Sequence, residues 1–169
     1  GIWIHGLPAD ENRDEFTRGC IAINNKNLEC LNKNINLDET LLIINNAKVE
    51  QNISKKTLAA LLAQLYAWRY AWLYDDIDAY MNFYSPEFVR NDGMKYNIFK
   101  MYKTRVFSKN EKKSIVFSNI TIVPYPNVAN TYQITFKEAF KSPTTEFNGN
   151  KSLVVEYEGK GNFKIVTEQ

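Results

Sequence analysis

The sequence predicts an α+β protein built from two parts. Apolar residues recur at helical spacing from about residue 54 to residue 107, and four later segments alternate between apolar and polar residues with turn residues between them. The charge balance changes near residue 52: residues 1–52 carry five Lys and Arg against eight Asp and Glu, whereas residues 53–169 carry sixteen against eleven. We therefore predict one part at 1–52 and a domain of three helices and four strands at 53–169.

The overall composition limits the classes of function. Of the 169 residues, 44% are hydrophobic and 24% are charged, which is typical of a globular chain and not of a disordered one. The net charge of +2 is too small to indicate nucleic acid as a partner. No apolar run approaches the roughly 18–20 residues that span a bilayer. Two cysteines do not make a disulfide framework.

Two short strands are expected in the first part. Residues 1–6 and 18–24 are rich in β-branched residues, and a loop at 7–16 with many charged residues separates them. The Asn-rich stretch 24–27 predicts a turn.

The stretch 36–50 leaves two interpretations open. Asn36 or Asp38 could cap a helix in front of a run of Leu and Ile residues. A short helix followed by a strand fits the same pattern, and periodicity alone does not decide between them.

Three helices are expected in the second part. The first begins at Ser54, a favourable N-cap, and one face of it carries an apolar stripe. The stripe consists of Leu58, Leu61, Leu62, Leu65, Trp68 and Trp72. The second helix, at 76–84, takes Asp75 or Asp76 as its cap and ends at the Ser-Pro pair that follows. The third spans about 95–107.

Four strands follow the helices. Alternating segments with turns of hairpin length between them predict an antiparallel meander. The segments are 114–126, 130–140, 151–159 and 162–169, and the turns are marked by Pro126–Asn127, Ser142–Pro143 with Gly149, and Gly159–Gly161. Three helices on such a curved sheet form one α+β domain.

His5 and Cys20 are the residues that most clearly indicate chemistry. A free thiol has a pKa of about 8.5 and is a poor nucleophile until it loses its proton. The only imidazole of the chain, His5, could take that proton and later give it to a leaving amine. Gly19 would allow a close approach of the backbone, so that the amide of Cys20 could face a developing oxyanion.

Other interpretations of these residues remain open at this point. Cys20 could be a small buried hydrophobe and His5 a residue whose hydrogen bonds are satisfied at a strand end. A disulfide between Cys20 and Cys30 would block the thiol. A metal site is not favoured, because one His and two Cys would need a fourth ligand that no motif supplies.

The segment around Cys20 resembles the signature of the L,D-transpeptidase (YkuD-like) family, which is His-Gly, a loop, and then Ser/Thr-His-Gly-Cys with an aliphatic residue. His5 and Gly6 match the first half, and Thr17, Gly19 and Cys20 match the second. This resemblance implies that residues 1–52 are the C-terminal portion of a β-rich YkuD-like domain.

Two positions depart from that signature. Arg18 stands where the family usually has a histidine before Gly-Cys, and the polar residue expected soon after the cysteine is displaced to Asn24–Asn25. Arg18 can meet a substrate carboxylate by a charge-assisted bond, although it could equally be an arginine of a solvated loop.

Residues 65–88 and the strands after them resemble the nuclear-transport-factor-2-like (NTF2-like, SnoaL-like) cone fold. A YkuD-like portion followed by such a domain is similar to the cell-shape-determining L,D-carboxypeptidases of helical bacteria. The resemblance implies a periplasmic protein that acts on peptidoglycan stem peptides (muropeptides). Fifty residues cannot bury a core alone. We expect a missing N-terminal part of the same protein, or a second copy in a homodimer, to pack against them.

The family implies a mechanism without a cofactor. Cys20 attacks the carbonyl between diaminopimelate and the terminal D-Ala of a stem tetrapeptide, and His5 activates the thiol and protonates the departing D-Ala. A backbone carbonyl orients the imidazole, with Gly6 and Gly19 as candidates. Thr17 and Arg18 would contact the substrate together with Gly6. Water then resolves the acyl-enzyme in a carboxypeptidase, whereas the amine of another stem resolves it in a transpeptidase.

The second part also allows more than one interpretation. Its aromatic residues could form a pocket that stacks on sugars or could simply be core; they are Trp68, Tyr70, Trp72, Tyr74, Tyr80 and Tyr84. A basic cluster could attract an anionic wall polymer or be a solvated helix face; it comprises Lys95, Lys100, Lys103, Arg105 and Lys109. An Asp base of the kind that ketosteroid isomerases use is a further option, but helix capping explains Asp75 and Asp76 more simply. The alternative function is therefore a non-catalytic module that binds peptidoglycan or a protein.

Overall fold

The computed structural model describes residues 3–7, 19–36, 40–46 and 52–169. The chain divides into two compact units, Gly1–Ile44 and Asn45–Gln169. This division falls somewhat before residue 52, where the sequence places the boundary.

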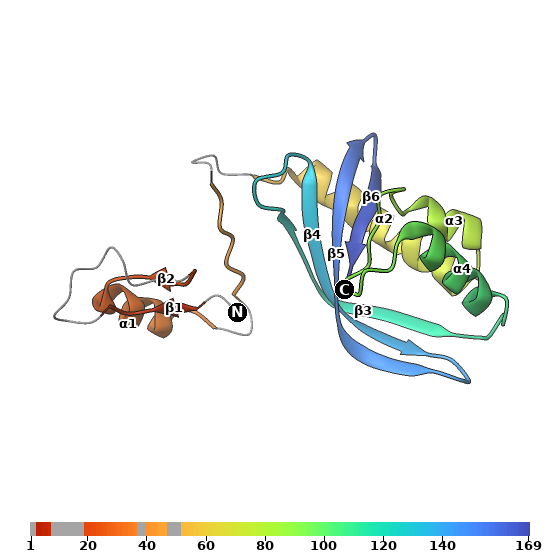
Figure 1. Cartoon of the computed structure of the whole chain (residues 1–169), viewed down its shortest axis with the longest axis horizontal. Coiled ribbons are helices and arrows are strands. Elements are labelled where there is room, and N and C mark those ends of the chain that lie inside the picture. Colours follow the sequence, from red (N-terminus) through yellow and green to blue (C-terminus); the bar gives the residue numbers. More distant parts are fainter. Residues whose placement is uncertain (1–2, 8–18, 37–39, 47–51) are drawn as a thin grey trace. The chain divides into compact units, whose positions relative to one another are not determined.

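The first unit contains two very short strands and one helix (Figure 1). Strand β1 (Ile4–His5) pairs in parallel with β2 (Ile21–Ala22). Helix α1 (Asn25–Asn34) begins directly afterwards, and the side chain of Asn24 accepts a hydrogen bond from the amide of Lys26 as its N-cap. The turn predicted at 24–27 is therefore wrong, because these asparagines start a helix.

The helix expected after Asn36 is not found where the structure describes that stretch. Residues 40–46 contain neither helix nor strand, and Asp38 lies outside the described residues. The apolar run in this segment stays exposed; its members are Leu41, Leu42, Ile43 and Ile44.

Helix α2 (Lys55–Leu73) confirms the first helix of the second part. The Ser54 hydroxyl accepts a hydrogen bond from the amide of Thr57, as the predicted N-cap should. The buried face consists of Leu61, Leu65, Trp68, Ala71 and Trp72. Leu58 and Leu62 were expected in the same stripe, but both are more than one third exposed, so the stripe is narrower than predicted.

Two shorter helices follow. Helix α3 (Ile77–Asn82) takes Asp76 as its cap through a hydrogen bond from the amide of Ala79. The neighbouring Asp75 instead has a positive φ of 58° and pairs with Lys113. Helix α4 spans Tyr96–Phe107, as the sequence predicts.

A four-stranded antiparallel sheet completes the second unit. The strands are β3 (Ser114–Pro124), β4 (Thr131–Lys141), β5 (Glu146–Gly159) and β6 (Asn162–Glu168), paired in that order. The predicted meander is confirmed, although β5 begins earlier than expected and includes Gly149. Figure 1 shows the sheet curving around the three helices.

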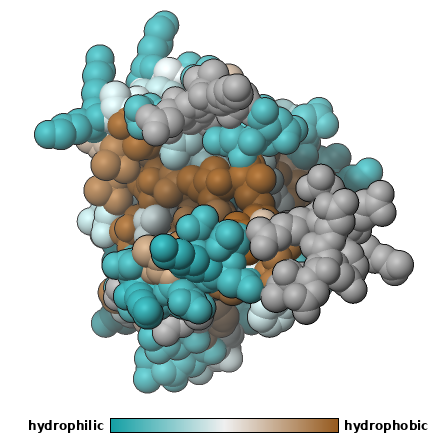
Figure 2. Space-filling view, turned by 90° about the vertical axis from the view of Figure 1, so that its left-hand side faces the viewer, coloured by the Kyte–Doolittle hydropathy of each residue, from teal (hydrophilic) through white to brown (hydrophobic). Residues whose placement is uncertain are grey.

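The core lies between the concave face of this sheet and the helices. It is unusually aromatic, and Trp68 stacks on both Tyr80 and Phe117 at its centre. Elsewhere apolar side chains reach the surface, and Figure 2 shows a face on which hydrophobic residues form a band bordered by hydrophilic ones. No helix in the part of the chain that the structure describes is long and apolar enough to cross a membrane.

Candidate functional site

His5 is held by its own strand end. Its Nδ1 lies 2.7 Å from the carbonyl oxygen of Gly6. A carbonyl can only accept, so Nδ1 carries a proton, and in the neutral imidazole the lone pair that can act as a base is on Nε2. Gly6 is one of the two carbonyls that the family resemblance names for this role. The imidazole is partly buried.

Cys20 lies directly before β2. Ile4 pairs with Ile21 and His5 with Ala22, and partners in register on parallel strands point to the same face. Cys20 precedes Ala22 by two residues, and residues two positions apart in an extended chain point to the same face. The register therefore indicates one face for the thiol and the imidazole.

No hydrogen bond joins the Cys20 thiol to His5 among residues 3–7 and 19–36. The disulfide interpretation is wrong, because Cys20 and Cys30 are both free. Gly19 has a φ of +92°, a conformation that glycine adopts without strain, and a Cβ there would meet no atom. Its requirement for glycine is therefore conformational.

Gly6 has a steric role as well as its carbonyl. A Cβ at this position would collide with Oδ1 of Asn25. That side chain bridges the backbone of Leu7, accepting from its amide at 2.7 Å and donating to its carbonyl at 2.9 Å. Asn24 and Asn25 thus have structural functions. Thr17 and Arg18 lie outside the described residues.

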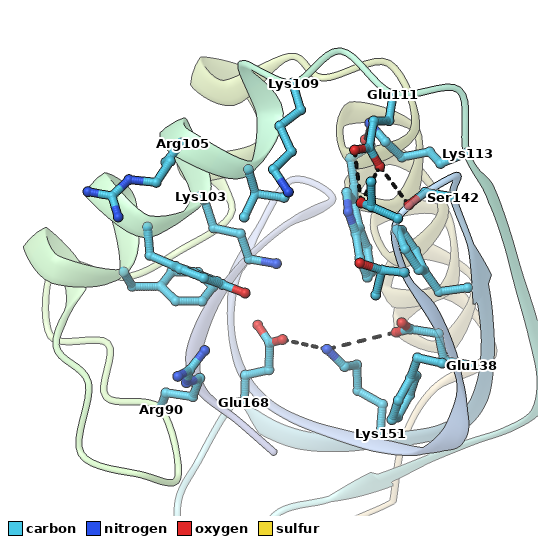
Figure 3. Close-up of a pocket in the computed structure, with 18 residues that line it drawn as sticks. Arg90, Lys103, Arg105, Lys109, Glu111, Lys113, Glu138, Ser142, Lys151 and Glu168 are labelled. Atoms are coloured by element: carbon cyan, nitrogen blue, oxygen red, sulfur yellow. Dashed lines mark hydrogen bonds and ion pairs between the residues drawn. The ribbon is translucent and has the colours of Figure 1, made fainter.

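The second unit contains a pocket of about 520 Å³ between α4 and the concave face of the sheet (Figure 3). Its aromatic walls include Trp72, Phe99 and Phe140. Six basic and three acidic side chains line the pocket. The basic ones are Arg90, Lys103, Arg105, Lys109, Lys113 and Lys151, and the acidic ones are Glu111, Glu138 and Glu168. The excess of positive charge suits an anionic ligand.

Lys103 points into this pocket from α4 (Figure 3) and is only 8% exposed. Its Nζ lies 4.8, 5.1 and 5.3 Å from the ring centres of Trp72, Tyr80 and Phe99. It has no hydrogen bond or ion pair with any residue that the structure describes. Burial lowers the pKa of Lys103 to about 8, against the opposing influence of Glu168. The ammonium is therefore held by aromatic faces and has no direct anionic partner.

Glu168 anchors a buried polar network on the pocket floor. Its Oε1 accepts from Lys151 Nζ at 2.6 Å, and its Oε2 accepts from the Tyr84 hydroxyl at 2.7 Å. The hydroxyls of Tyr84 and Tyr80 lie 2.7 Å apart. Burial raises the pKa of Glu168, but the positive charges of Lys151 and Lys103 lower it by more than burial raises it. The pKa of Glu168 therefore lies below its ordinary value.

Glu138 is less well satisfied. It is 2% exposed, and its Oε2 has no hydrogen-bond partner. Lys151 Nζ approaches that oxygen only to 3.8 Å. Burial raises the pKa of Glu138 in spite of this neighbouring charge.

Two further charges at the pocket have partners, whereas Arg105 and Lys109 are exposed to solvent. Glu111 accepts from the hydroxyls of Ser142 and Thr144 at 2.7 and 2.8 Å. Lys113 pairs with Asp75.

The aromatic cluster of the sequence divides between core and surface. Trp68, Tyr80 and Tyr84 are buried, and only Trp72 of the six lines the pocket. Tyr70 and Tyr74 are exposed and stack on each other. Searching the described residues gives no group of three His, Cys, Asp or Glu that could hold a metal ion.

The sequence pointed to part of this pocket, because Trp72, Lys103, Arg105 and Lys109 belong to the aromatic and basic clusters considered for ligand binding. Of the two interpretations of the basic cluster, a solvated helix face is wrong for Lys103, because Phe99, Lys103 and Phe107 recur at intervals of four and share the buried side of α4. Glu138 and Lys151 occupy inward positions of their strands, in line with Phe136 and Leu153. These spacings in the sequence indicate that Lys103, Glu138 and Lys151 point inward.

A model of one protein family, described as the Cds6 C-terminal NTF2-like domain, matches residues 60–169. The chain belongs to this family. The predicted NTF2-like domain, with its curved antiparallel sheet, is therefore confirmed. The family match begins within α2 and does not include the His5–Cys20 segment.

Similarity to solved structures extends over the whole chain. Pgp2 of Campylobacter jejuni, a helical cell shape determining protein, is 42% identical with a TM-score of 0.84, and a substituted form of it gives 0.87. Bd1075 of Bdellovibrio bacteriovorus is 26% identical with a TM-score of 0.75. The matches cover 100% of this chain and 60% of each of those proteins, so the chain spans about three fifths of their length.

More distant structures share the fold alone. An NTF2-like protein of unknown function from Pseudomonas putida is 9% identical, with a TM-score of 0.58 over 69% of this chain and 87% of its own. No curated protein matches the chain.

Proposed function

We propose that this chain is part of a periplasmic cysteine L,D-carboxypeptidase that trims peptidoglycan stem peptides and so affects cell shape. The proposal draws on the similarity to a cell-shape-determining protein and on the resemblance of the His5–Cys20 segment to YkuD-like enzymes. The observation that carries it is the 2.7 Å contact between His5 Nδ1 and the Gly6 carbonyl. This contact leaves Nε2 as the free base that a thiol nucleophile requires.

In this mechanism the proton of Cys20 passes to His5 Nε2, and the thiolate attacks the carbonyl carbon that precedes the terminal D-Ala. The C–N bond breaks as His5 returns the proton to the departing amine, which leaves a thioester on Cys20. Water, deprotonated by His5, then hydrolyses the thioester and releases a tripeptide. If another stem supplies the amine instead, the same thioester gives a crosslink, and the enzyme is an L,D-transpeptidase.

Cys30 provides a matched control for the test, because it is a free and exposed cysteine of the same unit. The full-length protein is incubated with a disaccharide tetrapeptide, and products are followed by mass spectrometry. We expect the loss of one D-Ala with the unmodified protein and with Cys30→Ala, and no loss with Cys20→Ala. New dimers would indicate transpeptidation. If Cys20→Ala is as active as the parent, the proposed nucleophile is wrong.

The first unit is proposed to need further protein around it. It exposes Trp3 and the four consecutive apolar residues Leu41, Leu42, Ile43 and Ile44, and a contiguous exposed apolar surface commonly marks an interaction site. We propose that a preceding part of the same protein packs there. For this reason the activity test uses the full-length gene product.

A second function is proposed for the NTF2-like domain, namely binding of an anionic group of peptidoglycan in the pocket. Lys103 supports it, because a buried ammonium without an anionic partner is costly unless a ligand completes the site. The test titrates the 169-residue chain with a disaccharide tripeptide by calorimetry. Lys103→Met should weaken binding at least tenfold. Lys100→Met, on an exposed part of the same helix, should leave it unchanged; equal binding by both variants would contradict the proposal.

A further inference from the structure

Two groups of opposite charge on the pocket floor lack hydrogen-bond partners. Lys103 Nζ has neither a hydrogen bond nor an ion pair within the described ranges of the chain. Glu138 Oε2 is buried without a hydrogen bond. Both residues are more than nine-tenths buried, so bulk water does not compensate either group.

Other charged groups near Lys103 and Glu138 do form hydrogen bonds. Glu168 accepts hydrogen bonds on both of its oxygens, and the carboxylate of Glu111 binds two hydroxyls. Arg90 forms a two-point contact with Asp92 at 3.0 and 2.6 Å. Among the described residues, Lys103 and Glu138 are therefore buried charges without a hydrogen bond on Nζ or Oε2, beside buried Glu168, which has one on each oxygen, and exposed Arg105 and Lys109, which water can solvate.

The two open groups lie at the same end of the pocket. The ammonium groups of Lys103 and Lys151 lie 4.8 and 5.5 Å from the centre of the Trp72 ring. Lys151 Nζ is in turn 3.8 Å from the unsatisfied oxygen of Glu138. Figure 3 shows Lys103 and Glu138 directed into the cavity from α4 and from the sheet. Both groups therefore face the same cavity beside Trp72, where one ligand can contact them.

The chemistry of the missing partners is complementary. An ammonium without an anion calls for a carboxylate, and a carboxylate oxygen without a donor calls for a protonated amine. We propose that the pocket recognises a zwitterionic α-amino acid end, with its carboxylate on Lys103 and its ammonium on Glu138. This inference rests on the proposed binding of peptidoglycan by the pocket. In a stem peptide the free end of diaminopimelate carries such a group.

A ligand that is only anionic would contact a different set of pocket residues. It would use Lys103 and the basic side chains around the rim, and it would leave Glu138 buried and unsatisfied. Glu138 would then repel it, since a carboxylate near a bound carboxylate is unfavourable. The position of Glu138 therefore favours a zwitterion over a simple anion.

The test compares two ligands on the 169-residue chain by calorimetry. One is a disaccharide tripeptide with the free ammonium of diaminopimelate, and the other is the same compound acetylated on that nitrogen. We expect acetylation to weaken binding about ten- to a hundredfold, because a hydrogen bond between charged groups is lost. A third compound, amidated on the adjacent carboxylate, should lose a similar factor through Lys103.

Variants separate recognition from crowding by the acetyl group. In Glu138→Gln the ratio between free and acetylated ligand should fall towards one, because the charged acceptor is gone. Glu156→Gln, an exposed substitution on β5, should keep the ratio of the parent. A thermal melt of each variant checks that it is folded.

Each outcome decides a different point. Equal affinity of the parent for free and acetylated ligand, with a loss in Lys103→Met, overturns the zwitterion and leaves an anion site. If Glu138→Gln leaves the ratio of the affinities for free and acetylated ligand unchanged, the acetyl group weakens binding only by its size. This outcome also overturns the zwitterion proposal. If no muropeptide binds the parent at all, the proposed binding function of the pocket fails together with this inference.

Discussion

The hydroxyl of Tyr84 donates a 2.7 Å hydrogen bond to Oε2 of Glu168, a residue 84 positions later in the chain. Both residues are almost fully buried. The bond ties the segment just after α3 to β6, where Tyr84 also forms a bridge with Ile165. A neutral donor on a buried carboxylate stabilises its charged form, and so this contact supports the charge distribution of the whole pocket floor.

Removal of the Tyr84 hydroxyl should therefore destabilise the domain. Tyr84→Phe leaves Glu168 with one hydrogen bond fewer in a buried site, which should lower the free energy of unfolding by about 1–3 kcal/mol. Tyr74→Phe is the matched control, because that side chain is 74% exposed and should change stability little. Urea denaturation followed by circular dichroism measures both; equal midpoints would show that the buried hydrogen bond contributes nothing.

The two buried carboxylates of the pocket should respond differently to the same substitution. Glu168→Gln removes the anion that contacts Lys151 at 2.6 Å and leaves this buried ammonium with only the 3.8 Å ion pair to Glu138, at a cost of about 3–5 kcal/mol. Glu138→Gln removes a charge with no hydrogen bond on Oε2, while Lys151 keeps Glu168, and stability should stay within about 1 kcal/mol of the parent. Thermal denaturation of the two variants checks this order, and the reverse order would contradict the assignment.

Titration of Lys103 should make stability rise with pH in the alkaline range. Its pKa is about 8 in the folded chain, against an ordinary value of 10.5. Between these values the unfolded chain binds a proton that the folded chain does not, so raising the pH favours folding, by about 3 kcal/mol in full.

Lys103→Met isolates this effect, because all other titrating groups remain. The difference in unfolding free energy between the parent and Lys103→Met should shift in favour of the parent from pH 8 to pH 10.5. A difference that stays constant over this range would mean that the ammonium is hydrated in the folded protein and has an ordinary pKa.

Local pattern predicted the helices of the second unit well. Ser54 caps α2 and Asp76 caps α3, because capping depends on residues only a few positions apart. The same logic failed at Asn24, where an Asn-rich stretch is compatible with a turn or with a helix start. Only the contact of Asn25 with the backbone of Leu7 distinguishes the two, and this contact lies across the first unit.

The pocket could be predicted only in part. Alternation along β4 and β5 places Glu138 and Lys151 inward, but it gives the wrong face for Glu168. Phe163 and Ile165 point inward on β6, so strict alternation would turn Glu168 outward. A register shift at Val154/Val155 reverses the faces beyond it, and sequence pattern alone does not reveal such a bulge.

The candidate catalytic pair was predicted from the sequence because the His5–Cys20 segment resembles the YkuD-like signature; residue types and spacing alone left a structural role open. His5 and Cys20 lie on paired strand segments, and one of the two expected carbonyls, that of Gly6, contacts the imidazole. The contacts of Thr17 and Arg18 stay predictions, because both residues lie outside the described part.

The position of Trp72 gives the pocket an optical reporter of its own. Its indole is 7% exposed, stacks on Phe140, and has the ammonium groups of Lys103 and Lys151 on its faces. The emission of an indole depends on the electric field across the ring, so neutralising either ammonium shifts the fluorescence of this residue. Occupancy of the pocket can thus be followed by intrinsic fluorescence, without attaching a dye.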